Sequence, residues 1–216
     1  MTSASPTTDD DSEPRSSRKR RAILQAATTV FFRNGYVGTS MDEIAALAAV
    51  SKQTVYKHFT DKESLFSELV ARTVREASDP VHDDVLNLPD SGDIAVDLRD
   101  LARRQVAKVM QPQILHLRRL VIGEASRFPE LGRTFYELGP GRTIAALATV
   151  FEKLAERGLL HLDDPALAAE HFNWLIMSIP LNRAMFLGED EVPTSAELEQ
   201  FAHAGVRVFL AAYGPR

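Results

Sequence analysis

The sequence predicts an all-α protein of about nine helices. Apolar residues recur three and four positions apart from Arg18 onward, which is the spacing of one face of a helix. Capping sequences such as Ser40-Met41-Asp42-Glu43 open several of these segments. No segment alternates apolar and polar residues as a half-buried strand does. These three observations favour helices throughout the ordered part of the chain.

The N-terminal part reads as an acidic tail followed by a compact helical domain. Residues 1–14 are small, polar and acidic, so we expect a disordered tail. A first helix is predicted from Arg18 to a stop at Gly35. Two short helices should follow, one opened by the Ser40 capping box and one from Lys52 to about Phe59. Short helices separated by about three residues make a helix-turn-helix, and we place this domain at residues 15–62.

The remainder, residues 63–216, is predicted to form a larger helical domain. Thr60-Asp61-Lys62-Glu63 resembles a capping box, Asp164-Pro165 suits a helix start, and Gly158 and Gly188 suit helix ends. Pro180 should kink its helix near Ile176. The predicted helices span residues 62–79, 92–110, 112–127, 130–137, 140–157, 165–187 and 195–213.

Composition restricts the class of protein. The chain has 216 residues, of which 44% are hydrophobic and 25% charged, and it contains no cysteine, so disulfides and thiolate metal sites are excluded. No apolar run reaches the length of a membrane span, and we expect a cytoplasmic protein. Residues 15–75 hold 11 Lys or Arg against 5 Asp or Glu, whereas residues 76–216 hold 14 against 21. A basic N-terminal module makes nucleic acid the first partner to consider, although uneven solvation is an alternative.

The stretch VSKQTVYKHFTDK, residues 50–62, is dense in hydrogen-bond donors. On a helix from Lys52, Val55 and Phe59 face the core and the polar side chains project outward. Such a face can enter a DNA major groove, which displays acceptors on base edges and phosphates. Lys62 opposes its own helix dipole, and a DNA phosphate would compensate this. The alternatives are a core tyrosine, a packed histidine and solvated lysines.

A second basic segment precedes the first helix and partly enters it. It contains Arg15, Arg18, Lys19, Arg20 and Arg21. We expect a flexible arm that reaches phosphates or the minor groove, with a solvated charge run as the alternative.

Residues 18–70 resemble the DNA-binding domain of the tetracycline-repressor (TetR) family of bacterial regulators, through the string GYVGTSMDEIAALAAVSKQTVYKHFTDKESLF. Ala49 departs from the family, which often has glycine in this turn; a left-handed Ala49 would cost about 1 kcal/mol. The resemblance implies contacts with double-stranded DNA at Ser40, Lys52, Gln53, Thr54, Tyr56, Lys57, His58 and Lys62, to which the basic segment adds Arg18 and Arg21.

The C-terminal domain resembles the AefR-like branch of the family through RLVIGEASRFPEL, residues 119–131. This resemblance implies a domain that dimerises and binds a small-molecule effector, without a cofactor. Large side chains around the Pro180 kink are the candidate ligand contacts, and an ordinary core role is the alternative. The candidates are Phe172, Trp174, Met177 and Phe151.

Dimerisation also has an independent physical reason. One short reading helix recognises too few base pairs, whereas two copies related by a twofold axis read a palindrome with half-sites about 34 Å apart. Gly205 in mid-helix suggests that another backbone crosses closely there. The candidate dimer stripe comprises Phe201, Ala202, Gly205, Val208, Phe209 and Ala212, and packing within one subunit is the alternative.

We therefore expect a homodimeric repressor, neither an enzyme nor a membrane protein, that releases a palindromic operator when a small molecule binds. One alternative is a C-terminal domain that binds a protein partner. A remote alternative is a helical metal enzyme using His161, Asp163, Asp164 and His171. Against it, the aspartates suit helix capping and the histidines are ten residues apart, off the spacing of one helix face.

Overall fold

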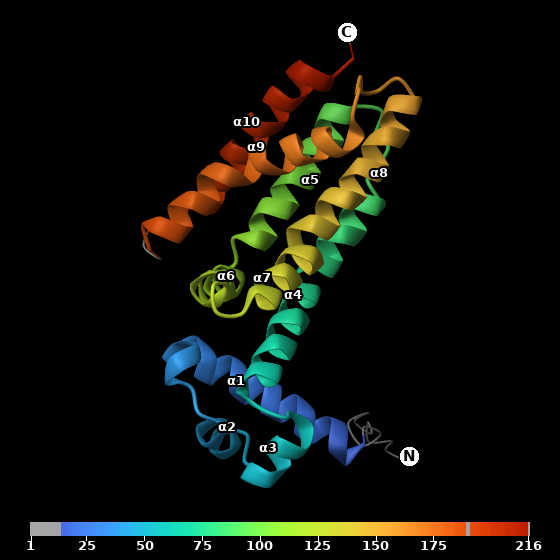
Figure 1. Cartoon of the computed structure of the whole chain (residues 1–216). Coiled ribbons are helices and arrows are strands. Elements are labelled where there is room, and N and C mark those ends of the chain that lie inside the picture. The colour runs from blue at the N-terminus through green and yellow to red at the C-terminus, as the bar shows by residue number, and fades with distance from the viewer. Residues whose placement is uncertain (1–13, 189–190, 216) are drawn as a thin grey trace, which may run out of the picture. The chain divides into compact units, whose positions relative to one another are not determined.

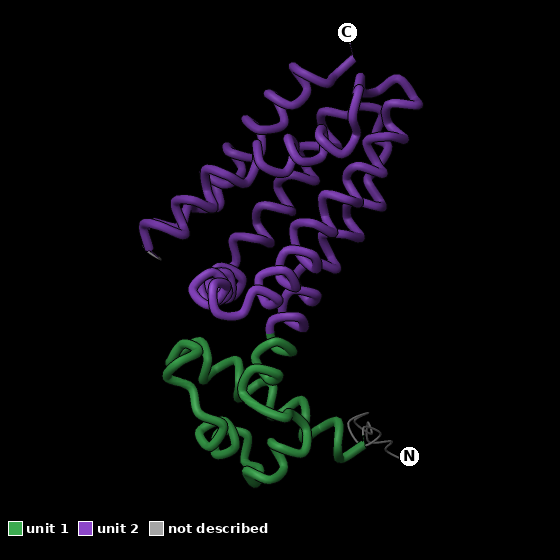
Figure 2. Tube along the Cα trace, viewed as in Figure 1, with its two compact units in different colours: residues 1–69 green, residues 70–216 purple. Residues whose placement is uncertain are grey.

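The computed structural model describes residues 14–188 and 191–215, and it confirms the all-α fold (Figure 1). Within these ranges the regular structure is helical and no strand forms. The chain divides into unit 1, residues 1–69, and unit 2, residues 70–216 (Figure 2). Most of the predicted acidic tail lies outside the described residues. No helix in the described ranges is long and apolar enough to cross a lipid bilayer.

Unit 1 contains helices α1 (Arg15–Gly38), α2 (Met41–Leu47) and α3 (Lys52–His58) and the start of α4 (Lys62–Leu86). The predicted stop at Gly35 marks a break inside α1, because Gly35 has φ 68° and ψ −179°. A last turn then continues to Gly38. The helix also begins three residues earlier than predicted, at Arg15.

Two predicted capping boxes form only in part. The Ser40 hydroxyl accepts the Glu43 backbone N–H at 3.1 Å, but the Glu43 carboxylate accepts hydrogen bonds from Arg33 and Asn34 on α1. At the start of α4, Asp61 and not Thr60 provides the cap, since its Oδ1 accepts the Ser64 N–H at 2.7 Å. In both cases a nearby polar partner replaces the expected one.

The core of unit 1 explains why it extends beyond the predicted boundary at residue 62. Phe66, in the second turn of α4, lies 4.6 Å from the Phe31 ring and 5.1 Å from the Tyr36 ring. Leu65 and Leu69 are also buried. The first two turns of α4 therefore belong to the hydrophobic core of the N-terminal unit.

Helix α4 runs through Pro80 to Leu86, seven residues beyond the predicted end at residue 79. Proline removes one backbone donor and normally ends or kinks a helix. Here Val81 and Val85, which follow the proline, are buried in unit 2, so apolar burial offsets the lost hydrogen bond.

Unit 2 contains the rest of α4 and the helices of the C-terminal domain close to their predicted ranges. They are α5 (Ile94–Val109), α6 (Pro112–Glu124), α7 (Pro129–Tyr136), α8 (Arg142–Glu156), α9 (Pro165–Phe186) and α10 (Ser195–Tyr213). Asp164 caps α9, and the predicted capping box between Thr194 and Glu197 opens α10. A π-helical segment, η2 (Glu137–Gly141), joins α7 to α8 and was not predicted.

Helix α10 packs on α9 and α5, and α9 also packs on α8 (Figure 1). Three buried aromatic rings, those of Phe151, Phe172 and Phe209, meet at centroid distances of 5.1 to 5.4 Å. Gly205 of α10 lies against α9, where an added Cβ would come within 2.7 Å of Ile176 Cγ2 and 3.0 Å of the Leu175 backbone. The backbone that crosses Gly205 thus belongs to the same chain.

Candidate nucleic-acid interface and ligand cavity

Helix α3 presents a polar outer face, as its sequence indicates. Val55 and Phe59 are buried, at 0% and 5% exposure, which fixes the helix on the core of unit 1. Gln53, Tyr56 and Lys57 are exposed, and Tyr56 keeps 45% of its surface accessible. A hydrogen-bonding tyrosine, an amide and an ammonium group therefore project from one short helix.

Thr54 and His58 are only partly exposed. The Thr54 hydroxyl lies 2.8 Å from that of Ser51, the cap of α3, and its backbone N–H is also bound by Ser51 Oγ at 3.1 Å. The centroid of the His58 ring lies 6.5 Å from that of the Phe59 ring. Thr54 and His58 therefore flank the exposed face of α3. A DNA contact by the Thr54 hydroxyl would compete with its hydrogen bond to Ser51.

Lys52 and Asp42 tie α3 to α2. The Lys52 ammonium lies 2.7 Å from Asp42 Oδ1, and both side chains are exposed. The hydrogen bond to Asp42 and the charge of this carboxylate raise the pKa of the Lys52 ammonium above its usual value. Lys52 is therefore a paired cation in the free protein, and a DNA phosphate would compete with Asp42 for its ammonium group.

Lys62 has a different environment from the one predicted. Its ammonium donates hydrogen bonds to the backbone carbonyls of Tyr36 at 2.8 Å and Thr39 at 2.9 Å, and it lies 4.6 Å from the Tyr36 ring centroid. These carbonyls end α1, where partial negative charge accumulates. A neighbouring helix end thus supplies the compensation that we expected from DNA, and the structural role of Lys62 was missed.

The basic segment at the start of α1 is helical, which corrects the prediction of a flexible arm. Arg18 and Arg21 are exposed on this helix. Arg20 instead turns back to the protein, where it pairs with Glu68 at 2.9 Å and covers the Phe59 ring. Ser40 is exposed where α2 begins, with its hydroxyl engaged as the helix cap.

The turn between α2 and α3 contains Ala49, which has φ 52°. It is the one non-glycine residue with positive φ in the described ranges. The left-handed conformation considered for Ala49 is therefore present, and it places a strained alanine shortly before α3.

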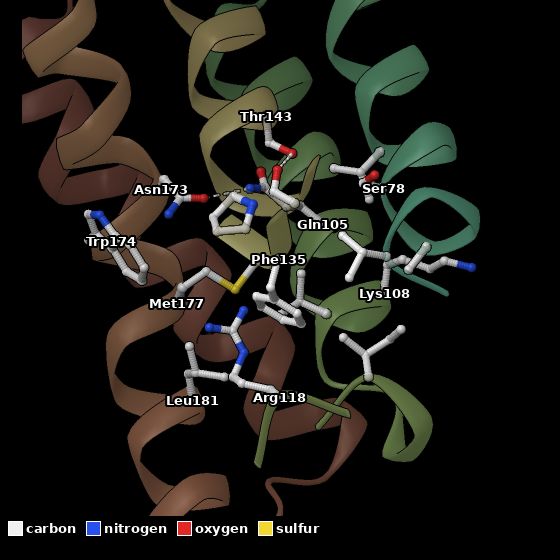
Figure 3. A pocket seen from close by; sticks show the side chains of 17 residues that line it. Ser78, Gln105, Lys108, Arg118, Phe135, Thr143, Asn173, Trp174, Met177 and Leu181 are labelled. Carbon is white, nitrogen blue, oxygen red and sulfur yellow. Dashed lines mark hydrogen bonds between the residues drawn. The ribbon is translucent and has the colours of Figure 1, made fainter. Parts of the chain in front are cut away.

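Unit 2 contains a narrow cavity (Figure 3). The cavity has a volume of about 60 Å³ for water-sized molecules. Its total empty space, with the opening to solvent included, is about 630 Å³. Helices α4 to α9 and η2 all contribute to its wall, including Gly139 and Pro140 of η2. The lining is mainly apolar, with Val81, Phe135 and Leu181 among its members.

Polar or charged side chains interrupt the apolar lining at six positions, which are Ser78, Gln105, Lys108, Arg118, Thr143 and Asn173. Gln105 donates to Asn173 Oδ1 at 2.9 Å, and both residues are buried. The Gln105 Oε1 atom is buried without a hydrogen-bond partner, as is Arg118 Nε. The Arg118 guanidinium lies 5.0 Å from the Phe135 ring centroid, and burial lowers the pKa of Arg118 below its usual value.

The structure brings two of the four predicted ligand residues to the cavity. Trp174 and Met177 line it, and Trp174 donates to Glu170 Oε2 at 2.7 Å. Phe151 and Phe172 do not line it, because they pack against Phe209 in the solid part of the core. The Pro180 segment stays helical to Phe186, so the cavity is enclosed by several helices and does not depend on one predicted kink.

Sequence reasoning missed Gln105 and Arg118. A signal existed for Gln105, which falls on the same helical stripe as Leu98, Leu101 and Ala102, where only apolar side chains are expected. Arg118 lies among apolar residues of α6, but a long cation at a helix surface usually extends to water. Its burial depends on contacts with α7 and is invisible in the local sequence.

The predicted dimer stripe on α10 splits into two faces. Ala202, Gly205 and Phe209 are buried within the chain, so they cannot contribute exposed surface to a partner. Val208 and Ala212 are exposed and Phe201 is partly exposed. The two faces were merged because their residues share an apolar character and interleave along the helix.

The residues of the remote metal-site alternative have other contacts. Asp164 caps α9 by accepting backbone N–H groups, and His171 Nδ1 lies 2.6 Å from the Tyr213 hydroxyl. Across the described part of the chain, no group of three His, Cys, Asp or Glu side chains is arranged to hold a metal ion.

Family models match both parts of the chain. The model for bacterial regulatory proteins of the tetR family matches residues 23–69, and the model for the C-terminal domain of AefR-like transcriptional repressors matches residues 96–215. Shorter similarities join the N-terminal part to the HTH-type regulators YhgD of Bacillus subtilis, at 46% identity over 54 residues, and QacR of Staphylococcus aureus, at 44% over 48. These matches span only 28% and 26% of the two relatives.

Solved structures resemble nearly the whole chain. A TetR-family transcriptional regulator from Mesorhizobium loti is 48% identical, with a TM-score of 0.87 over 94% of this chain and 100% of the other. The flavonoid-responsive regulator FrrA is 34% identical, with a TM-score of 0.74 over 93% and 99%. With a family model on more than half of its length and a structural relative along nearly all of it, the chain belongs to the TetR family of DNA-binding transcriptional regulators, which are not enzymes.

Proposed function

We propose that the protein is a homodimeric repressor that binds a palindromic operator through α3 and releases it when a small molecule enters the cavity of unit 2. The observation that carries this proposal is the pairing of an exposed donor face on α3 with a lined cavity in a separate unit. The match to AefR-like transcriptional repressors favours repression over activation.

The chemistry of α3 suits the major groove. The Gln53 amide can donate to and accept from an adenine edge, and Lys57 can donate to guanine acceptors or to phosphate. Tyr56 adds a hydroxyl donor to the same exposed face. Phosphate contacts by Arg18, Arg21 and Ser40 would then fix the orientation of the unit on the duplex without reading sequence.

Helix α9 supports a second copy as partner. Apolar side chains lie on all sides of it, and it holds only three charged or histidine side chains, Glu170, His171 and Arg183, in 22 residues. One side covers the core, yet Leu167, Ile179 and Phe186 on the other side are 50%, 54% and 81% exposed. A helix that is hydrophobic all round is normally buried all round. A twofold interface that includes α9 and Val208 of α10 would bury these side chains.

The cavity favours a small-molecule effector over a protein partner, because it is concave and mainly apolar with a few converging polar groups. FrrA, which is similar over nearly its whole length, is described as flavonoid-responsive, so flat aromatic molecules are the first class to test. The ligand acts only through its different affinity for the DNA-binding and released forms. A hundredfold loss of operator affinity requires about 2.7 kcal/mol of such coupling.

Selection of genomic DNA fragments by the purified full-length protein tests the proposal. We expect enrichment of an inverted repeat, and sedimentation should show a dimer. Tyr56→Ala should weaken binding to the selected fragment about tenfold, while Tyr136→Ala, an equally exposed tyrosine of unit 2, should leave it unchanged. The proposal fails if no duplex is retained at low salt, or if both tyrosine variants bind equally well.

A further inference from the structure

Arg118 places a positive charge inside a largely apolar cavity. Its Nε is buried without a partner, and its charge faces the Phe135 ring. Burial lowers the pKa of the group, and no Asp or Glu lines the cavity beside it. Arginine nevertheless stays protonated in proteins. A partly buried cation without an anion is incompletely compensated, and so the free protein offers a site for negative charge.

The composition of the cavity wall strengthens this point. Residues 76–216 hold 21 acidic against 14 basic side chains, yet the cavity is lined by Lys108 and Arg118 and by no Asp or Glu. Figure 3 shows that the Lys108 ammonium points away from the cavity centre, whereas the Arg118 guanidinium lies next to Met177 and Phe135. One cation therefore dominates the interior, and its planar fork suits the two oxygens of a carboxylate.

The Gln105–Asn173 pair supplies the second polar group of the cavity. Their single hydrogen bond leaves the buried Gln105 Oε1 as a free acceptor and leaves the Asn173 NH₂ as a donor. If both amides were turned over, one acceptor and one donor would still remain. In Figure 3, Met177 and Phe135 lie between this pair and the guanidinium. A hydroxyl group, which donates and accepts, satisfies both free positions.

The wall between the two polar ends is mainly apolar. The cavity is narrow for its total volume, as its small room for a water-sized sphere shows. Phe135, Trp174 and Met177 line it, and aromatic and thioether side chains favour contact with an aromatic ring.

We infer that the effector is a flat aromatic acid whose carboxylate binds the Arg118 guanidinium and whose opposite end carries a hydroxyl group that meets the Gln105–Asn173 pair. The inference rests on the proposed function of the cavity as the effector site. It assigns the chemical class of the ligand from the charge and hydrogen-bonding groups of the residues that line the cavity.

Three matched probes test the assignment by calorimetry on the full-length protein without DNA. They are 4-hydroxycinnamate, the neutral 4-hydroxycinnamamide, and cinnamate, which lacks the hydroxyl group. We expect the hydroxy acid to bind at least tenfold more tightly than its amide and about tenfold more tightly than cinnamate, the ratio that a difference of 1.4 kcal/mol gives. Trp174 is the single tryptophan of the chain and lines the cavity, so its fluorescence reports occupancy independently.

Arg118→Gln should abolish the preference for the acid over the amide while leaving the affinity for the amide unchanged. Arg118→Lys should restore part of the preference, because it restores the charge without the fork. Lys108→Gln is the matched control and should keep the full preference. Without ligand, Arg118→Gln should melt at the same temperature as the wild type or higher, since it removes an unpaired, partly buried charge.

Equal affinity for the acid and the amide overturns the assignment, as does a preference that survives Arg118→Gln. Failure of all three probes to bind up to millimolar concentration, with unchanged Trp174 fluorescence, also overturns it. Operator release is measured separately with the same probes. If the protein binds the acid selectively but does not release the operator, the ligand class is supported and the proposed regulation is contradicted. If the full-length protein binds no DNA even without ligand, only the proposed function is contradicted.

Discussion

The two units of the protein carry their candidate functional side chains in opposite settings. In unit 1, Gln53, Tyr56 and Lys57 project outward from a single seven-residue helix. In unit 2, Gln105 and Arg118 point into a cavity that needs several helices to enclose it. A surface face depends on a short local pattern, whereas a cavity depends on long-range packing. The first can therefore be inferred from sequence spacing, and the second cannot.

Within α10, Gly205 and Val208 lie only about 60° apart around the helix axis, yet Gly205 is buried against α9 and Val208 is exposed. Gly205→Val should destabilise unit 2 by about 3 kcal/mol, because even a Cβ would approach Ile176 Cγ2 to 2.7 Å and the Leu175 backbone to 3.0 Å. Gly205→Ala should also be destabilising, although helix propensity alone predicts a gain of about 1 kcal/mol. Thermal and urea unfolding measure both variants.

Val208→Ala is the control for the Gly205 variants. Val208 is 51% exposed in the single chain, so its loss should leave subunit stability unchanged within about 0.5 kcal/mol. If Val208 lies at the proposed twofold interface, the substitution should instead weaken the dimer, as measured by sedimentation at several concentrations. A stabilised Gly205→Ala variant would contradict the close approach of α9.

In unit 1, Lys62 is a lysine with structural contacts, whereas Lys57 is a lysine that we propose faces DNA. Lys62→Ala removes two charged hydrogen bonds to the end of α1 and the contact with the Tyr36 ring, and we expect a loss of about 2 kcal/mol in the unfolding free energy of unit 1. Operator affinity should fall with it. Lys62→Met, which keeps the apolar stem, should recover only part of the stability. An unchanged unfolding transition in both variants would restore the simpler view of Lys62 as a phosphate contact.

Lys57→Ala should change DNA binding without changing stability, because Lys57 is exposed and forms no part of the core. We expect about a tenfold loss of operator affinity, and the slope of log affinity against log salt should become shallower by about one if Lys57 contacts a phosphate. Lys52→Ala is a useful comparison. Its effect should be smaller, because Asp42 already neutralises Lys52 in the free protein. Equal salt slopes for Lys57→Ala and the wild type would remove Lys57 from the phosphate contacts.

Much of the fold could be predicted because helices carry local signals. Asp164, Thr194 and the 3.6-residue spacing of apolar side chains place α9 and α10 to within a residue or two. The predicted end of α4 at residue 79 was too early, because burial of Val81 and Val85 in unit 2, which no local pattern shows, offsets the cost of Pro80. The π-helical segment η2 contains the non-helical Gly139 followed by Pro140, in a Gly-Pro-Gly sequence that indicates a break but does not specify a π-helix.

The candidate sites divide in the same way. The outward face of α3 follows from the positions of Val55 and Phe59, so its exposed donors could be predicted. The partners of Lys62 are 23 and 26 residues away in the sequence, and no local pattern identifies them. Trp174 and Phe172 are two positions apart on α9 and were treated alike, yet only Trp174 reaches the cavity. Residues two positions apart on a helix point about 200° away from each other around its axis. A prediction based only on side-chain size and polarity does not take this angle into account.

The smallest expected effect lies in the turn before α3, where sequence and structure agree. Ala49 adopts φ 52°, a conformation that costs an L-residue about 1 kcal/mol and costs glycine little. Ala49→Gly should therefore stabilise unit 1 by somewhat less than 1 kcal/mol, because glycine also has more entropy to lose on folding.

Ala46→Gly is the matched control, since Ala46 is exposed within α2 and its replacement should destabilise by about 1 kcal/mol. Urea unfolding of the two variants gives opposite signs if the turn is strained. If both variants are destabilised, Ala49 adopts its conformation without strain. Glycine at this position would then offer no gain in stability over alanine.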